Sequence, residues 1–174
     1  MTSRGQTRNP GKKKGEVREA TRTGPAAGES LRVESVMKPP QGCREGDSVR
    51  ECAKMMKERN VGFVPVCNAA SEPIGAATDR DLTIRVLGEG RSADTKVDDV
   101  MTREIVSCRI GDDLATAERL MRDHHKSRVM VCDEGRKLVG VISLSDIVDL
   151  EDEGAAARTM RDVASRENQQ PYAS

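Results

Sequence analysis

The chain has 174 residues, with 29 basic and 29 acidic side chains and a formal net charge of zero at pH 7. A balanced charge gives no overall field to attract nucleic acid or an anionic membrane surface. One Phe, one Tyr and no Trp leave almost no rings for the stacking on which single-stranded nucleic-acid binders depend. No apolar run approaches the roughly 20 residues of a membrane-spanning helix, so we expect no membrane partner and no nucleic-acid partner.

Cysteine usage favours a reducing compartment. The cysteines are odd in number, form no Cys-x-x-Cys pair, and follow a chain start without the apolar stretch of a signal peptide. This pattern is typical of reduced, cytoplasmic proteins. We therefore expect thiols at Cys43, Cys52, Cys67, Cys108 and Cys132. The alternative is a redox switch that uses Cys67 and Cys132, or Cys43 and Cys108.

Both ends of the chain are polar. Residues 1–30 carry seven Lys or Arg against three Glu and almost no large apolar side chains, and such a segment cannot offset the entropy of ordering. We predict a disordered basic tail, the alternative being a basic arm that touches nucleic acid. Residues 153–174 are predicted to form a second polar tail, in which a helix would place Ala156, Met160 and Val163 on one face.

From residue 43 the sequence repeats itself at an offset of 65 residues, without a gap, through residue 82. Ten of these forty positions are identical, and just upstream the Val-x-x-Val-Met opening at 33–37 matches 97–101 at an offset of 64. Each copy is about sixty residues long, which is short for burying a core alone. We therefore predict two half-domains, 31–92 and 93–152, packed around a pseudo-two-fold axis with clefts between them.

Each copy begins with a predicted amphipathic helix. Asp47, or Asp112 in the second copy, is a good N-cap. Apolar residues then recur at i, i+3, i+4 and i+7 over 49–56 and at i, i+3, i+6 and i+7 over 114–121, which is the spacing of a helix with one apolar face.

A strand hairpin and a short helix follow in each copy. Apolar runs on both sides of a polar turn predict the strands, and the predicted fold class is therefore α+β, with two β-α-β-β-α repeats. Short strands are expected near residue 43 and residues 105–107, before the first helices. The remaining elements are strands at 63–67, 74–78, 128–132 and 138–143 and helices at 80–87 and 144–150.

The end of each hairpin carries the most informative motif. Residues 75–81 read GAATDRD and residues 140–146 read GVISLSD, so Thr78 or Ser143 precedes Asp81 or Asp146 by three positions. One interpretation is a helix start, in which the hydroxyl accepts from backbone N–H groups and the acid complements the helix dipole. A binding interpretation uses the same geometry, because free N–H groups suit phosphate and an Asp can accept both hydrogens of a ribose diol.

The repeat, the two Val-x-x-Val-Met openings, the FVPV strand at 63–66 and the two Gly-x-x-(Ser/Thr)-x-x-Asp endings resemble a tandem pair of cystathionine-β-synthase-type (CBS) domains, a Bateman module. The resemblance covers about 33–150. It implies a regulatory protein without catalytic activity that binds AMP, ADP, ATP, NAD or S-adenosylmethionine between its repeats, requires no cofactor, forms a homodimer and signals to an effector protein. The TDRD form resembles stand-alone bacterial members, including stress- and hypoxia-response proteins.

The resemblance also implies a role for each motif residue. Asp81 and Asp146 would hold the riboses, and Thr78 and Ser143 the ribose or the first phosphate. The adenine would lie against the strands, at Val64, Pro65, Ala76, Val129, Met130 and Val141. The phosphates would be bound by the neighbouring cations Arg80, Lys126 and Arg128.

Departures between the copies predict two inequivalent clefts, because the second copy lacks counterparts of Arg80 and Pro65. His124 and His125 are adjacent on a helix and point in different directions, so we expect no metal site there. The sequence holds no nucleophile-and-base motif, and no catalytic residue is assigned. The rival hypothesis is a constitutive dimerisation or adaptor protein in which the two acids act only as helix-start groups.

Overall fold

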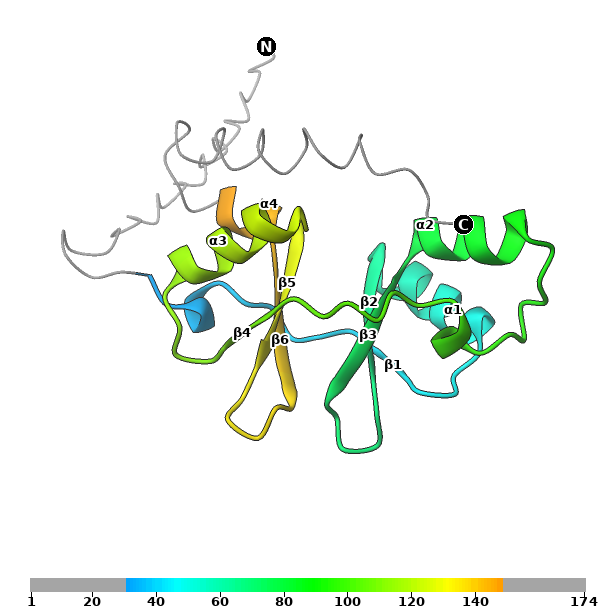
Figure 1. The fold of residues 1–174 in the computed structure, drawn as a ribbon, viewed down its shortest axis with the longest axis horizontal. Helices are drawn as coiled ribbons and strands as arrows, with labels where there is room; N and C mark the ends of the chain where they lie inside the picture. Colours follow the sequence, from blue (N-terminus) through cyan, green and yellow to red (C-terminus); the bar gives the residue numbers. More distant parts are fainter. Residues whose placement is uncertain (1–30, 149–174) are drawn as a thin grey trace, which may run out of the picture.

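The computed structural model describes residues 31–148, so the predicted tails at 1–30 and 153–174 lie outside the described residues. Two three-stranded sheets stand next to each other, with their hairpins in the middle of the molecule and their helices toward the outside (Figure 1). The α+β class expected from the sequence is confirmed.

The first half contains β1 (Cys43–Arg44), α1 (Val49–Arg59), β2 (Phe63–Cys67), β3 (Pro73–Thr78), α2 (Asp79–Leu82) and the π-helix η2 (Thr83–Gly88). The second half contains β4 (Ser107–Arg109), α3 (Leu114–His124), β5 (Arg128–Cys132), β6 (Leu138–Ser143) and α4 (Leu144–Val148). A 3₁₀ turn precedes each half, η1 (Val33–Ser35) and η3 (Val97–Asp99).

The two sheets have the same topology. β1 runs parallel to β2 and β2 antiparallel to β3, and β4, β5 and β6 repeat this arrangement. In the hairpins Phe63 pairs with Thr78 and Arg128 pairs with Ser143, and each hairpin contains one bulge. The sequence repeat is therefore also a structural repeat.

The long helix of each half begins one residue later than the sequence predicts. Ser48, and not Asp47, is the N-cap of α1: its hydroxyl accepts from the Glu51 N–H, and the Glu51 carboxylate accepts from the Ser48 N–H at 2.8 Å. The Asp47 carboxylate instead accepts from the Arg44 N–H at 2.7 Å, because the turn after β1 folds back toward it. The same one-residue difference occurs at α3.

One pair of cysteines differs from the sequence expectation. Cys43 in β1 and Cys52 in α1 are joined as a disulfide inside the first half, with their Cα atoms 6.0 Å apart. Cys67, Cys108 and Cys132 are free thiols. Spacing along the chain could not reveal the pair, because β1 and α1 meet only after the turn between them reverses the chain.

The opening segment of each repeat packs in the core of the other half. Val33 and Val36 are buried in the second half, whereas Val97, Val100 and Met101 are buried in the first half. In Figure 1 the blue start of the described chain accordingly lies beside α3 and β4. The boundaries 31–92 and 93–152 stay a prediction for the sequence repeat, but in space each half is completed by residues of the other.

Gly75 and Gly140 permit these crossings. A Cβ atom on Gly75 would lie 2.6 Å from the Met101 Sδ and 2.7 Å from the Thr102 carbonyl oxygen, and a Cβ atom on Gly140 would lie 2.6 Å from the Met37 Sδ. Interiors are packed too closely to absorb such an atom without movement. The absence of a side chain at Gly75 therefore leaves room for Met101, and its absence at Gly140 leaves room for Met37.

Candidate functional site

The motif of the first repeat forms the junction of β3 and α2, which we call the first corner (residues 78–81). Thr78 is the N-cap of α2 and forms a capping box with Asp81. The Thr78 N–H donates to Asp81 Oδ2 at 2.8 Å, and the Asp81 N–H donates to Thr78 Oγ1 at 3.1 Å. The helix-start role of the motif is therefore present, and it uses one of the two carboxylate oxygens.

The second corner (residues 143–146), where β6 meets α4, repeats this geometry. The Ser143 N–H donates to Asp146 Oδ2 at 2.8 Å, and the Asp146 N–H donates to Ser143 Oγ at 3.3 Å. Among the residues that the structure describes, Asp146 is the one buried charged residue, with 8% of its surface exposed. A buried carboxylate needs compensating partners.

The remaining carboxylate oxygens bind cations that differ between the corners. Asp146 Oδ1 contacts the Lys38 ammonium, whereas Asp81 Oδ1 lies 3.4 Å from the Arg85 guanidinium, one turn further along the same helix. Burial by itself raises the pKa of Asp146, but the hydrogen bonds from Lys38 and Ser143 outweigh it, so the pKa lies below its ordinary value. Asp146 is therefore held as a carboxylate.

A contact between equivalent residues connects the two corners. The Arg128 guanidinium stacks on the Phe63 ring, with its carbon 5.6 Å from the ring centre, within the range of a cation–π interaction. Phe63 pairs across β2 and β3 with Thr78, and Arg128 pairs across β5 and β6 with Ser143. Residues paired in register share one face of a hairpin, so both corners border the interface between the sheets.

The residues expected to line an adenine separate into two groups. Val64 and Val129 are fully buried in the cores of their own halves, so the structure does not bring their side chains to the interface between the sheets. The other four alternate with the core positions along their strands and pair in register, Pro65 with Ala76 and Met130 with Val141. These four share a face with Phe63 and Arg128, and on that face Pro65, Ala76 and Met130 are buried as well, whereas Val141 is partly exposed.

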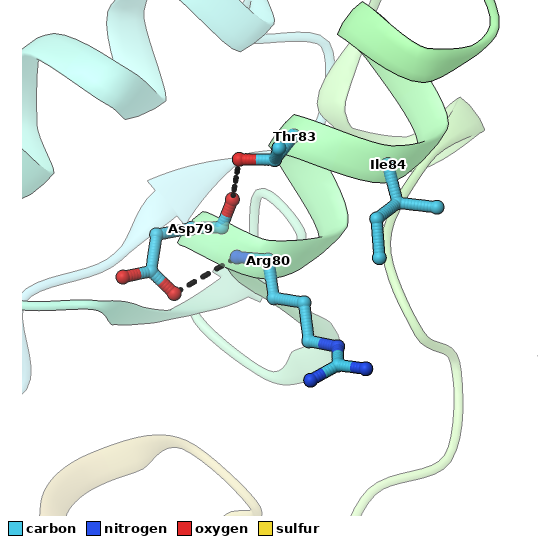
Figure 2. A pocket seen from close by; sticks show the side chains of 4 residues that line it. All are labelled: Asp79, Arg80, Thr83 and Ile84. Carbon is cyan, nitrogen blue, oxygen red and sulfur yellow. Dashed lines mark hydrogen bonds between the residues drawn. The ribbon is translucent and has the colours of Figure 1, made fainter.

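The three expected phosphate-binding cations lie in different surroundings. Arg80 lies on α2 in a pocket lined with Asp79, Thr83 and Ile84, where its side chain extends from the helix beside Ile84 (Figure 2). Lys126 pairs with Glu104 at 3.1 Å, and this bond lowers the pKa of Glu104. Arg128 is the cation stacked on Phe63.

Sequence reasoning missed Lys38 and Arg85, the cations that do contact the acids. For Arg85 a signal was available, because a basic residue four positions after Asp81 lies on the same side of a helix. For Lys38 the signal was weaker: it follows the Val-x-x-Val-Met opening, at the point where the offset changes from 64 to 65. Only the crossing of the opening segments brings it to Asp146.

The described part of the chain contains neither a group of metal ligands nor a membrane-spanning helix. Within residues 31–148, no three His, Cys, Asp or Glu side chains are grouped to hold a metal ion. No helix of this range is long and apolar enough to cross a membrane.

The duplicated hairpins, the crossed openings and the paired capping corners define a tandem pair of small α+β repeats of the CBS type. The CBS domain signature matches residues 33–88 and 97–153, which is more than half of the chain. The protein therefore belongs to the CBS domain family, and the resemblance inferred from the sequence is confirmed.

Two curated relatives each match more than half of the chain. The CBS domain-containing protein YhcV of Bacillus subtilis is 36% identical over 100 residues, covering 58% of this chain and 70% of YhcV. MK0525 of Methanopyrus kandleri is 32% identical over 102 residues, again covering 58% of this chain. The match spans about half of MK0525, 52% of its length.

Solved structures show the same fold. The CBS domain protein PAE2072 of Pyrobaculum aerophilum, crystallised with AMP, matches with a TM-score of 0.63 at 23% identity, covering 78% of this chain and 99% of PAE2072. The CBS domain pair of MJ0100, crystallised with 5′-methylthioadenosine and S-adenosylmethionine, matches with a TM-score of 0.63 at 23% identity, covering 70% and 96%. At this identity the likeness establishes the fold.

Proposed function

We propose that this CBS pair is a regulatory module that binds an adenosine-containing ligand, namely AMP, ADP, ATP, NAD or S-adenosylmethionine, at the interface between its repeats. The observation that carries the proposal is the pair of corners, each presenting a hydroxyl and a carboxylate beside the facing sheets. A carboxylate next to a helix start accepts charge-assisted hydrogen bonds from a ribose diol. The AMP bound to PAE2072 and the S-adenosylmethionine bound to MJ0100 support this class of ligand.

The residue roles follow from the same proposal. Asp81, or Asp146 at the second corner, accepts from ribose hydroxyls, and Thr78 or Ser143 contacts the ribose or the first phosphate. The apolar face formed by Pro65, Ala76, Met130 and Val141 receives the base, and the flanking cations Arg80, Lys126 and Arg128 supply phosphate contacts.

Ligand binding regulates by favouring one relative orientation of the two halves. A ligand shifts such an equilibrium only by its difference in affinity for the two orientations. The crossed openings, Val33 in the second half and Val97 in the first, support mechanical coupling of this kind. We further propose that the module works as a homodimer in the cytoplasm, without catalytic activity of its own, and that an effector protein reads its orientation, as in a stress response.

A thermal-shift screen tests the proposal directly. At least one of AMP, ADP, ATP, NAD and S-adenosylmethionine should raise the melting temperature, because binding to the folded state alone stabilises it by mass action. Asp81→Asn keeps the size of the side chain and removes its charge, so affinity at the first corner should fall about ten- to a hundredfold.

The capping box of α1 supplies a matched control. Glu51→Gln alters the same kind of helix start at Ser48, on a different helix from the corners, so it should leave ligand affinity unchanged. If none of the five compounds shifts the melting temperature, the proposed function is wrong.

The second candidate is a constitutive dimerisation or adaptor protein. It is favoured by one observation: at both corners the hydroxyl and the acid already bind each other within the chain. This candidate predicts that Asp81→Ala lowers the melting temperature in the absence of ligand and that the five compounds have no effect.

A further inference from the structure

The residue that faces the acid of each corner differs between the two halves. Lys38 donates its backbone N–H to the Val141 carbonyl at 2.9 Å and accepts from the Val141 N–H at 3.0 Å, which fixes it beside β6. Thr102 makes the same two bonds with Ala76 in β3, at 2.8 and 2.9 Å. Lys38 and Thr102 match at the 64-residue offset of the opening segments, so they occupy equivalent places in the two halves.

At the second corner, Lys38 binds the acid, Asp146. The Lys38 ammonium contacts Asp146 Oδ1, and Ser143 binds Oδ2, which leaves 7% of the Asp146 side chain exposed. Both carboxylate oxygens are thus bonded within the chain, one of them to a full positive charge. A ribose diol that reached Asp146 would have to displace a cation, and a neutral hydroxyl is a weaker partner for a carboxylate than an ammonium.

At the first corner the acid stays accessible. Thr102 is neutral, and its hydroxyl accepts from the Arg85 guanidinium at 3.3 Å. The same guanidinium nitrogen donates to the Val100 carbonyl at 2.6 Å and lies further from Asp81 Oδ1, at 3.4 Å. The Asp81 side chain is 18% exposed, more than twice the exposure of Asp146. Arg85 is therefore held mainly by the crossing segment, and Asp81 Oδ1 retains the capacity to accept from a ligand.

We infer that the residue facing the acid decides which corner binds the adenosine ligand: Thr102 opens the first corner, and Lys38 closes the second. This inference rests on the proposed function and adds that each chain binds one ligand. Lys38 acts as a specificity-determining residue, because its ammonium holds the place that a ribose would take. The asymmetry at the acids arises from this position of the repeat together with Arg85, whose counterpart in the second copy is Leu150.

An exchange of the two residues tests this inference. Isothermal titration calorimetry is performed with each of AMP, ADP, ATP, NAD and S-adenosylmethionine on the full chain and on Lys38→Thr, Thr102→Lys and the double exchange. The wild-type chain should bind one equivalent and Lys38→Thr two. Thr102→Lys should weaken binding at least about tenfold, since an ammonium then faces Asp81. In the double exchange the single site should move to the second corner.

The location of each site is read with conservative changes of the acids. Asp81→Asn should weaken the wild-type site about ten- to a hundredfold, whereas Asp146→Asn should weaken only the site that Lys38→Thr creates. Lys38→Met, which removes the charge and keeps the length of the side chain, is the second variant if Lys38→Thr unfolds, and thermal melting verifies the fold of every variant. Lys38→Met should likewise bind two equivalents.

Three results would overturn the inference while leaving the proposed function intact. They are two sites in the wild-type chain, one unchanged site in Lys38→Thr and Lys38→Met, or wild-type affinity in Thr102→Lys. Binding of no compound by any of these proteins would refute the proposed function together with the inference. Binding by Lys38→Thr alone would also overturn the inference, because the first corner of the wild-type chain would then not be open to the ligand.

Discussion

Gly75→Ala should destabilise the fold by closing the space through which the opening of the second repeat crosses. The new Cβ atom would lie 2.7 Å from the Thr102 carbonyl oxygen, so this backbone would have to move by about 0.7 Å to restore ordinary contact. The Thr102 carbonyl accepts from the Ala76 N–H at 2.9 Å, and the movement would weaken that bond. Overpacking costs about 1–3 kcal/mol and a hydrogen bond about 0.5–1.5 kcal/mol, which gives an expected loss of about 2–4 kcal/mol.

Urea unfolding measures this loss as a lower transition midpoint. With a slope of about 2 kcal/mol per molar urea, the midpoint should fall by about 1–2 M. Gly88→Ala is the matched control, because its nearest new contact is the Thr83 carbonyl oxygen at 3.7 Å, and it should stay within about 0.5 kcal/mol of wild type. If the Gly75→Ala protein is as stable as the Gly88→Ala protein, the crossing of the opening segment does not explain why position 75 is a glycine.

Three further predictions concern charge, capping and thiol chemistry. The pKa of Asp146 is lowered by Lys38 and Ser143, so its charge stabilises the fold fully above the ordinary value of 3.8, and this contribution is lost as pH falls through the folded-state pKa. Asp146→Asn should therefore reduce the dependence of the unfolding free energy on pH in the acid range, as measured by urea titration. An unchanged slope would contradict this. Ser48→Ala removes the α1 cap and should cost about 1 kcal/mol in thermal or urea unfolding, whereas no loss would show that the cap contributes nothing. Burial raises the pKa of Cys108 to about 11, so mass spectrometry after alkylation at pH 8 should find it far less modified than an unfolded control; equal labelling would disprove its burial.

The crossed openings make the core of each half depend on the other repeat. Each half buries apolar residues from the other repeat, Val36 in the second half and Val100 in the first. The segment that contributes Val36 also carries Lys38 to the second corner, and the segment that contributes Val100 carries Thr102 to the first. Each corner is therefore completed by backbone that belongs to the opposite repeat.

The sequence by itself determined the features that depend on local periodicity and on duplication. The 65-residue repeat, the α+β class, the hairpins and the placement of Thr78, Asp81, Ser143 and Asp146 at strand-to-helix junctions all follow from spacing along the chain. These features need only neighbours within a few residues, whose geometry is fixed by helix and strand periods. The predicted helix starts were wrong by one residue. The Asp47 carboxylate accepts from the Arg44 N–H in the turn before α1, and Ser48 is the N-cap.

Only the tertiary structure decided which distant residues meet. The contact of Lys38 with Asp146, the stacking of Arg128 on Phe63 and the pairing of Cys43 with Cys52 join residues that no local pattern relates. Each depends on where the chain crosses between the halves or reverses direction, and that path is selected by burial of the whole core, because no single segment can bury its apolar residues alone. For the same reason the two corners, which share the (Ser/Thr)-x-x-Asp pattern, acquire different cations and different exposure.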